Sequence, residues 1–200
     1  MTHRFGITFD YLCPFARNGN EQVIAALRDG ADLEVDWMPF SLAQAHVEEA
    51  DPAVWDQDAP EQVPGVLALQ AGLAIRDHLP ERFLDAHEQL FAARHDHGQD
   101  IKDPQVIREA LARAEVDADE VFARIEDGSP LATLREEHQA ASAREIFGVP
   151  TFVTEQRAVF VRILSRPNGD GRAYGRIKSV LELIDGDLDL HEFKQADLPY

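Results

Sequence analysis

The stretch that decides the fold is DYLCPFA, residues 10–16, where a strand ends and a helix begins. Before it, residues 5–9 alternate between large apolar and small or polar side chains, which is the period of a half-buried strand. Directly after Cys13 stands a proline, which suits the first turn of a helix because its missing N–H is not needed there. We therefore expect a helix over residues 14–27 with Cys13 at its amino end.

A second strand follows at residues 33–37, where Leu33, Val35 and Trp37 alternate with acidic residues and Pro39 ends the run. Trp37 lies on the apolar face of this strand, and we expect it in the core. Two strands joined by a helix form the βαβ unit of a parallel sheet. The first forty residues thus predict the edge of an α/β fold.

Residues 42–147 read as helical throughout. Aspartate or serine followed by proline, and single aspartates, mark helix starts, and glycines mark helix ends. These signals predict helices at 63–77, around 83–91, from Asp103, from Asp117 to Gly128, and from Ser129 to Phe147.

The strand period returns after residue 150. Residues 151–154 and 158–161 read as a hairpin, and apolar residues from Ile177 to Ile184 mark a last helix. The acidic tail after Gly186 is expected to be poorly packed. This order predicts an α/β, thioredoxin-like fold with an all-helical insertion, divided into a thioredoxin-like domain at 1–41 and 145–190 and an insertion domain at 42–144.

Composition narrows the possible partners and locations. The formal net charge of −18 argues against nucleic acid and anionic membranes, since both are polyanions. No apolar run approaches the roughly 20 residues that span a bilayer. The first ten residues lack the basic and apolar regions of a secretory signal, so a cytoplasmic location is expected. A single cysteine excludes a disulfide within the chain and a zinc site built from several cysteines of one chain.

Two motifs together resemble the DsbA-like oxidoreductases: DYLCPFA at residues 10–16 and GVPTF at residues 148–152. The resemblance runs from Arg4 to about Ile184 and includes cytoplasmic members that work with low-molecular-weight thiols such as mycothiol or glutathione. It implies that Val149–Pro150 is a cis peptide bond facing the cysteine.

The chain departs from this family at Ala16, where the usual Cys-x-x-Cys motif has its second cysteine. A dithiol cycle needs that second thiol to resolve the mixed disulfide from within. The chain therefore resembles the monothiol variants. It is also similar, more loosely, to kappa-class glutathione transferases and 2-hydroxychromene-2-carboxylate isomerases, which usually carry serine at the position of Cys13.

Cys13 is the predicted nucleophile. A helix amino terminus offers free N–H groups and the positive end of the helix dipole, and both favour the thiolate; the alternative is a buried, inert cysteine. If the proline is cis, the backbone N–H and C=O of Val149 are free to pair with an extended ligand. Asp10 is either a proton shuttle or simply the end of a strand. The residues expected to bind substrate or thiol are Tyr11, Pro14, Phe15, Val149, Pro150 and Thr151.

Two further clusters have a functional and a plain interpretation. His95, Asp96, His97 and Asp100 resemble metal ligands, but their spacing does not place neighbours on one helix face, and we expect no metal. In the loop at 165–172, arginines including Arg166 and Arg172, together with Arg162, could meet the carboxylates of a thiol cofactor; a solvated loop is the alternative.

Three functions remain. The first is a monothiol thiol–disulfide oxidoreductase in which a small-molecule thiol resolves the adduct on Cys13. The second is a kappa-like isomerase or transferase, in which a bound cofactor thiol is the nucleophile and Cys13 only donates a hydrogen bond. The third is a non-catalytic binding protein. In the first two the partner is a small-molecule thiol or disulfide, and in the third it is a peptide or a small molecule. None of the three involves nucleic acid or a membrane, and a homodimer stays open.

Overall fold

A computed structural model describes residues 2–186 and 189 of the chain. Its sheet has the strand order β2-β1-β3-β4, in which β1 and β2 are parallel and the other two pairs are antiparallel. The strands are β1 (His3–Phe9), β2 (Leu33–Pro39), β3 (Thr151–Val153) and β4 (Ala158–Phe160). The hairpin of β3 and β4 confirms the prediction made for residues 151–161.

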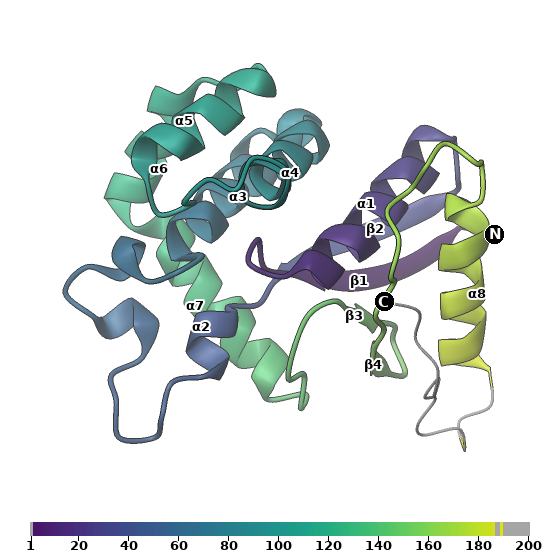
Figure 1. Cartoon of the computed structure of the whole chain (residues 1–200). Coiled ribbons are helices and arrows are strands. Elements are labelled where there is room, and N and C mark those ends of the chain that lie inside the picture. Colours follow the sequence, from purple (N-terminus) through teal and green to yellow (C-terminus); the bar gives the residue numbers. More distant parts are fainter. Residues whose placement is uncertain (1, 187–188, 190–200) are drawn as a thin grey trace.

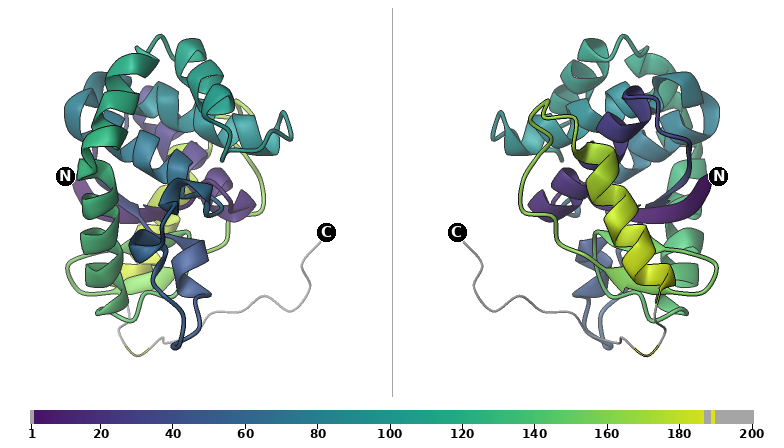
Figure 2. Two further views of the ribbon diagram at one scale, coloured as in Figure 1. Left: turned by 90° about the vertical axis from the view of Figure 1, so that its left-hand side faces the viewer. Right: turned by 90° about the vertical axis from the view of Figure 1, so that its right-hand side faces the viewer.

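Two helices cover one face of this sheet (Figure 1). They are α1 (Pro14–Arg28) and α8 (Ala173–Asp185), which pack against each other. Val23 of α1 and Ile177 of α8 share a buried cluster with Phe5 and Ile7 of β1 and Phe152 of β3. Figure 2 shows α8 lying across the sheet, on the opposite side of the molecule from α7 (Ser129–Ser142).

The segment between β2 and β3 supplies the remaining helices. They are α2 (Leu42–Ala45), the short 3₁₀ helices η1 (Val54–Asp56) and η2 (Pro60–Gln62), α3 (Val66–His78), α4 (Pro80–His95), α5 (Pro104–Arg113), α6 (Ala118–Asp127) and α7. This arrangement confirms the α/β, thioredoxin-like fold with a helical insertion. The exact domain boundaries stay a prediction.

The sequence correctly predicted helix starts and ends where the capping residue itself carries the signal. Asp103 and Asp117 cap α5 and α6 through their side chains, and Gly128 ends α6 with φ of 81°. The helix predicted to reach Phe147 instead ends at Ser142, because Glu145 adopts a positive φ of 60° that a helix cannot accommodate.

The prediction of helix throughout residues 42–147 was also wrong at the start of the segment. Between α2 and α3 the chain forms only η1, η2 and connecting loops, and α3 begins after Gly65, whose φ is 81°. The prediction for the tail after Gly186 concerns residues that, apart from position 189, lie outside the described part of the chain. None of the described helices is long and apolar enough to span a membrane.

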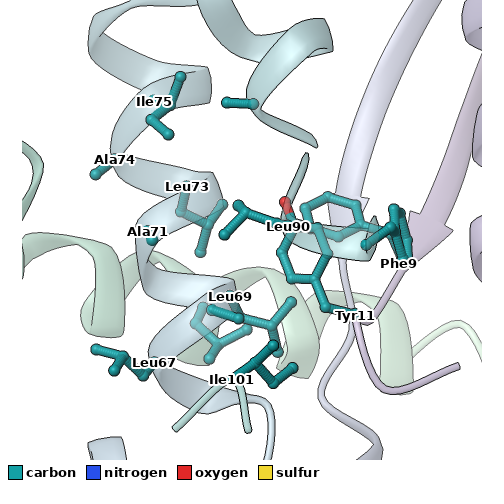
Figure 3. Packing of buried hydrophobic residues seen from close by; sticks show 14 of the residues in the cluster. Phe9, Tyr11, Leu67, Leu69, Ala71, Leu73, Ala74, Ile75, Leu90 and Ile101 are labelled. Atoms are coloured by element: carbon teal, nitrogen blue, oxygen red, sulfur yellow. The ribbon is translucent and has the colours of Figure 1, made fainter. Parts of the chain in front are cut away.

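The larger core lies between the end of β1 and the inserted helices (Figure 3). Phe9 and Tyr11 are fully buried there, in one cluster with Leu73 of α3 and Leu90 of α4. A Cβ atom on Gly72 of α3 would lie 2.3 Å from the Tyr11 hydroxyl oxygen, so only glycine lets α3 approach this ring. The chain segment just before Cys13 is thereby anchored to the insertion.

Candidate active site around Cys13

Cys13 is the N-cap residue of α1, with an extended backbone (φ −94°, ψ 119°) and a half-buried side chain. Its Sγ accepts a hydrogen bond from the Ala16 N–H at 3.4 Å. The thiol in turn lies 3.5 Å from the Val149 carbonyl oxygen, to which it donates. The Val149–Pro150 peptide bond is cis. The structure therefore brings together residues that are 136 positions apart in the chain.

The expectation that the helix terminus makes this thiol acidic was wrong. Burial raises the pKa of Cys13 above its ordinary value of 9.0, while the N–H groups of Ala16 and Phe15 lower it and the Asp10 carboxylate raises it again. The helix terminus stabilises the thiolate, but desolvation penalises the charged form more strongly. At neutral pH the thiol is protonated and acts as a hydrogen-bond donor.

Hydrogen bonds from two threonines hold the loop that carries Pro150. Thr8 of β1 donates from its hydroxyl to the Gly148 carbonyl (3.2 Å) and accepts from the Thr151 N–H (2.7 Å). The Thr151 hydroxyl also donates to Gly148 (2.8 Å) and is buried. Thr151 therefore positions the loop, and the expectation that it binds substrate directly was wrong.

Helix α1 packs closely on this loop because Gly19 has no side chain. A Cβ atom there would lie 3.1 Å from the Pro150 ring. The C=O of Val149 is not free as expected, since it accepts from Cys13. Its N–H has no acceptor among the described residues, although Val149 as a whole is buried.

Asp10 connects the site to the insertion. It is fully buried, and its two carboxylate oxygens accept from the N–H groups of Leu12 (2.9 Å) and Leu42 (2.7 Å). Burial raises its pKa to about 6, although both N–H groups and Arg94 lower it. Because both oxygens hold backbone donors, the structure favours a positioning role for Asp10, at the junction where the chain leaves the sheet, over the proton shuttle.

The aromatic residues that flank Cys13 have different environments. Tyr11 is fully buried, so its ring cannot wall a substrate pocket as expected. Pro14 is exposed and Phe15 is half-buried at the surface. The Arg162 guanidinium lies over the Phe15 ring, 5.2 Å from its centre. Of the expected wall, only Pro14 and Phe15 can touch a ligand at the thiol.

Ala16 occupies the position of the absent second thiol. It is fully buried, and only its N–H faces the Cys13 sulfur. Its carbonyl accepts from the Asn20 side chain at 2.8 Å. A group that resolves a disulfide on Cys13 must therefore come from outside the chain.

Sequence analysis missed a buried polar chain behind Cys13. The Tyr11 hydroxyl meets Nδ1 of His87 (2.8 Å), and Nε2 of His87 meets the Asn20 side-chain oxygen (3.2 Å). Burial lowers the pKa of His87 to about 3, so the ring is neutral. The Tyr11 hydroxyl therefore donates to Nδ1 of His87, and Nε2–H of His87 donates to the Asn20 side-chain oxygen. The Asn20 side-chain N–H donates in turn to the Ala16 carbonyl. The signal in the sequence was the polar Asn20 four residues after Ala16, on the buried face of α1.

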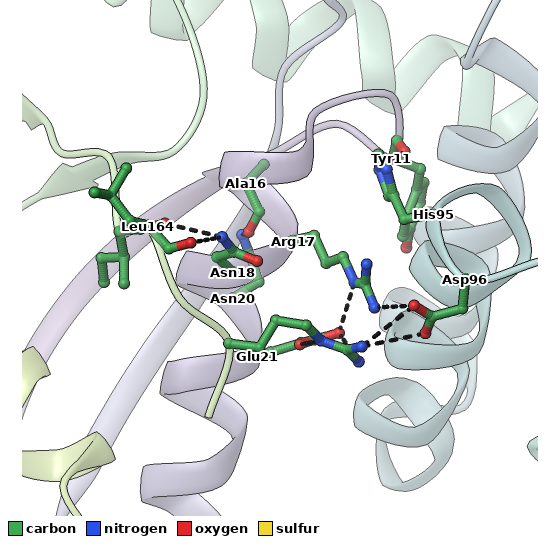
Figure 4. Close-up of polar contacts among 11 residues, drawn as sticks. Tyr11, Ala16, Arg17, Asn18, Asn20, Glu21, His95, Asp96 and Leu164 are labelled. Carbon is green, nitrogen blue, oxygen red and sulfur yellow. Dashed lines mark hydrogen bonds and ion pairs between the residues drawn. The ribbon is translucent and has the colours of Figure 1, made fainter. Parts of the chain in front are cut away.

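A second missed feature is a cluster of ion pairs, which we name the α1–α4 clasp: Arg17, Glu21, Asp96 and Arg166 (Figure 4). Buried Arg17 contacts Glu21 (3.0 Å) and Asp96. Arg166 contacts both Glu21 oxygens (2.6 and 2.9 Å) and Asp96 (3.2 Å). Arg166 is thus held by protein carboxylates and is not free to meet those of a cofactor.

His95 and Asp96, which resembled metal ligands in the sequence, likewise make contacts within the protein. Nε2 of His95 donates to the Tyr11 carbonyl at 2.9 Å, and Asp96 belongs to the clasp. In the described part of the chain, no three histidine, cysteine, aspartate or glutamate side chains converge as a metal site would require.

Comparison with known proteins agrees with this geometry. The family model described as "DSBA-like thioredoxin domain" matches residues 7–163. The chain is 26% identical over 196 residues to Rv2286c of Mycobacterium tuberculosis, an uncharacterized protein, and the match covers 96% of this chain and 81% of that protein.

Several solved structures are similar at low sequence identity. A putative protein disulfide isomerase from Nitrosomonas europaea has a TM-score of 0.62 at 12% identity, covering 92% of this chain and 99% of that one. The cytosolic disulfide reductase DsbM from Pseudomonas aeruginosa, solved with GSH, has a TM-score of 0.59 at 16% identity, covering 88% and 99%. DsbA from the same organism has a TM-score of 0.58 at 16% identity, covering 89% and 81%. These structural matches show the fold. Because the family model spans most of the chain, the chain belongs to the DSBA-like thioredoxin domain family.

Proposed function

We propose that this protein is a thiol–disulfide oxidoreductase that works in monothiol mode through Cys13. The observation that supports it is the half-buried Cys13 thiol beside the cis Val149–Pro150 bond, where the Val149 N–H has no partner among the described residues. Family membership supports thiol chemistry, and Ala16 restricts it to one thiol. The location we propose is the cytoplasm, where a lone thiol is kept reduced.

The reaction is two exchanges at one sulfur. The Cys13 thiol first loses its proton to a solvent base. The thiolate then attacks one sulfur of a disulfide R–S–S–R′, so that a Cys13–S–S–R bond forms while R′–S⁻ leaves. A second small-molecule thiolate attacks the R sulfur and releases the Cys13 thiolate. We propose mycothiol or glutathione as that co-substrate; the DsbM structure, which holds GSH, supports this choice.

Val149 has two roles in this proposal. Its carbonyl holds the resting Cys13 S–H at 3.5 Å. Its N–H donates to a ligand laid along the loop, as an added strand would be held. Phe15 and Pro14 contact the same ligand from the α1 side.

Mass spectrometry tests the proposal. After incubation with glutathione disulfide or mycothiol disulfide, we expect one adduct on Cys13 that a free thiol removes, and none on Cys13→Ser. A failure to form any adduct, under conditions that modify a control monothiol enzyme, would contradict it.

One observation favours the second candidate function. Because burial raises the pKa of Cys13, the thiol keeps its proton, and its single S–H can turn from the Val149 carbonyl to the sulfur of a bound thiol cofactor. In that kappa-like chemistry Cys13→Ser retains most of the activity, whereas in thiol exchange it abolishes the activity. If the wild type and Cys13→Ser both bind a ligand and neither catalyses a reaction with any thiol, the chain is a binding protein.

A further inference from the structure

A cavity of about 590 Å³ lies at the outer edge of β2, where the sheet meets the inserted helices. Its lining includes Leu27 near the carboxyl end of α1, whereas Cys13 caps the amino end of that helix. Most of its lining is apolar: Leu27, Val35, Trp37, Met38, Pro80, Phe83 and Leu84, with Asp36, Arg76 and Glu137 as the charged members. Trp37, expected in the core, is half-buried and forms part of this wall.

The cavity lies against the backbone edge of the strand. Residues 35–38 all line it, although successive side chains of a strand point to opposite faces of the sheet. Only a space at the edge itself touches both sets.

Backbone groups at this edge are open. His3 donates to the Asp32 carbonyl and Phe40 donates to Phe9, so β2 pairs with β1 through its even-numbered residues. The N–H and C=O groups of Val35 and Trp37 therefore point outward. Arg76 donates to the Trp37 carbonyl at 2.8 Å. Among the described residues, the N–H groups of Val35 and Trp37 and the C=O of Val35 have no partner.

The charge around this edge is acidic. Arg76 is held by Glu137 (2.6 Å) and Asp77 (2.6 Å). On the other side Arg4 lies 3.5 Å from Glu34 and 3.9 Å from Asp36, and these two carboxylates are 58% and 62% exposed. Four carboxylates thus share two guanidinium groups.

This charge disfavours a second copy of the chain as the occupant. In an antiparallel pair of two β2 strands centred on Val35, Glu34 would stand opposite Asp36 of the other copy. Like charges directly opposite each other destabilise a strand pair. A basic segment has the complementary charge.

We propose that the β2 edge binds an extended segment of another polypeptide, which adds a strand to the sheet. Its backbone pairs with Val35 and Trp37, its apolar side chains enter the cavity, and its lysine or arginine side chains, on alternate residues, meet Glu34 and Asp36. This proposal is independent of the chemistry at Cys13.

The probe is a fluorescein-labelled peptide, acetyl-Lys-Val-Lys-Leu-Lys-Val-amide, titrated with the full chain and followed by anisotropy. We expect saturable binding, and protection of the Val35 and Trp37 amide protons from hydrogen exchange. N-methylation of the amides on one edge of the peptide should weaken binding about tenfold, because two backbone hydrogen bonds are lost, while methylation of the other edge should not.

Charge reversal provides matched variants. Asp36→Lys should weaken binding about fivefold, whereas Glu136→Lys, the same change at an exposed position of α7, should not. Cys13→Ser should bind the peptide as the wild type does, which separates this site from the thiol.

Three results would overturn the proposal. The first is binding that is indifferent to N-methylation and to Asp36→Lys, since the peptide would then only fill an apolar hole. The second is protection of the Val149 amide in place of Val35 and Trp37. The third is a dimer, found by sedimentation, that Asp36→Lys changes and the peptide does not displace.

Discussion

At Cys13, burial opposes the two N–H groups at the start of α1, and burial prevails. The rate of alkylation by iodoacetamide should therefore keep rising with pH beyond 9.0, the ordinary pKa of the group, because only the thiolate reacts. Stopped-flow alkylation followed by mass spectrometry measures this profile, with Cys13→Ser as the unreactive control. A plateau reached near neutral pH would show that the helix terminus prevails instead.

Tyr11 illustrates how one hydroxyl serves the core. Tyr11→Phe keeps the ring in place but leaves Nδ1 of buried His87 without its donor. We expect a loss of about 1–2 kcal/mol in the free energy of unfolding, measured with urea. Tyr174→Phe is the matched control, since the hydroxyl of this half-buried tyrosine on α8 makes no hydrogen bond to any described residue. Equal losses in the two variants would contradict the role of the His87 contact.

At the scale of elements, the α1–α4 clasp joins two helices and the loop before α8. Arg17 and Glu21 are buried (9% and 4% of their side chains exposed), whereas Arg166 is 48% exposed. Arg17→Met should cost about 3 kcal/mol, because it breaks a buried ion pair. Arg166→Ala should cost less than about 1 kcal/mol, because water replaces much of its contact.

The two variants should also differ in which amides exchange. Arg166→Ala should speed hydrogen exchange in residues 165–172 with little change elsewhere, since this loop loses the ion pairs of Arg166. The hydrogen bonds from Asn18 and Gln22 of α1 to the carbonyls of residues 163–165 remain and should limit the effect there. Denaturation and exchange mass spectrometry on both proteins test this pair. A loss of stability in Arg166→Ala as large as that in Arg17→Met would show that the loop, and not the buried pair, carries the energy.

At the scale of the whole molecule, the free energy of unfolding depends on pH through His87, which lies where the sheet meets the inserted helices. His87 has a pKa of about 3 in the folded chain against 6.5 for an ordinary histidine. The unfolded chain therefore binds this proton first, and stability falls as pH falls from about 6.5 towards 3. Asp10 acts in the opposite direction, since its folded pKa of about 6 lies above 3.8 and protonation favours the fold.

Burial also lowers the pKa of His138, on α7, to about 4. The difference between wild type and His87→Gln isolates the effect of His87, because Asp10 and His138 contribute to both proteins. Between about pH 7.5 and pH 5, wild type should lose about 2 kcal/mol that the variant does not lose. Urea unfolding at the two pH values measures it. If the difference in free energy of unfolding between the two proteins is the same at both pH values, His87 takes up its proton in the folded chain as it does in the unfolded chain.

Local signals in the sequence predicted much of the fold. Alternation gave β1 and β2, Pro14 gave the start of α1, and Asp103 and Asp117 gave two caps, because strand period and helix capping depend on neighbours in the chain. The same signals failed where the backbone turns without a glycine or proline, as at Glu145.

By itself the sequence determined that one thiol stands at a helix start and that Ala16 cannot assist it. The tertiary structure decided the state of that thiol, the burial of Tyr11, the clasp and the open β2 edge. Cys13 and Val149 lie 136 positions apart, and Tyr11 and His87 lie 76 apart. Desolvation and hydrogen-bond partners depend on such distant neighbours, which no local pattern encodes, and this is why the acidity of Cys13 was predicted with the wrong sign.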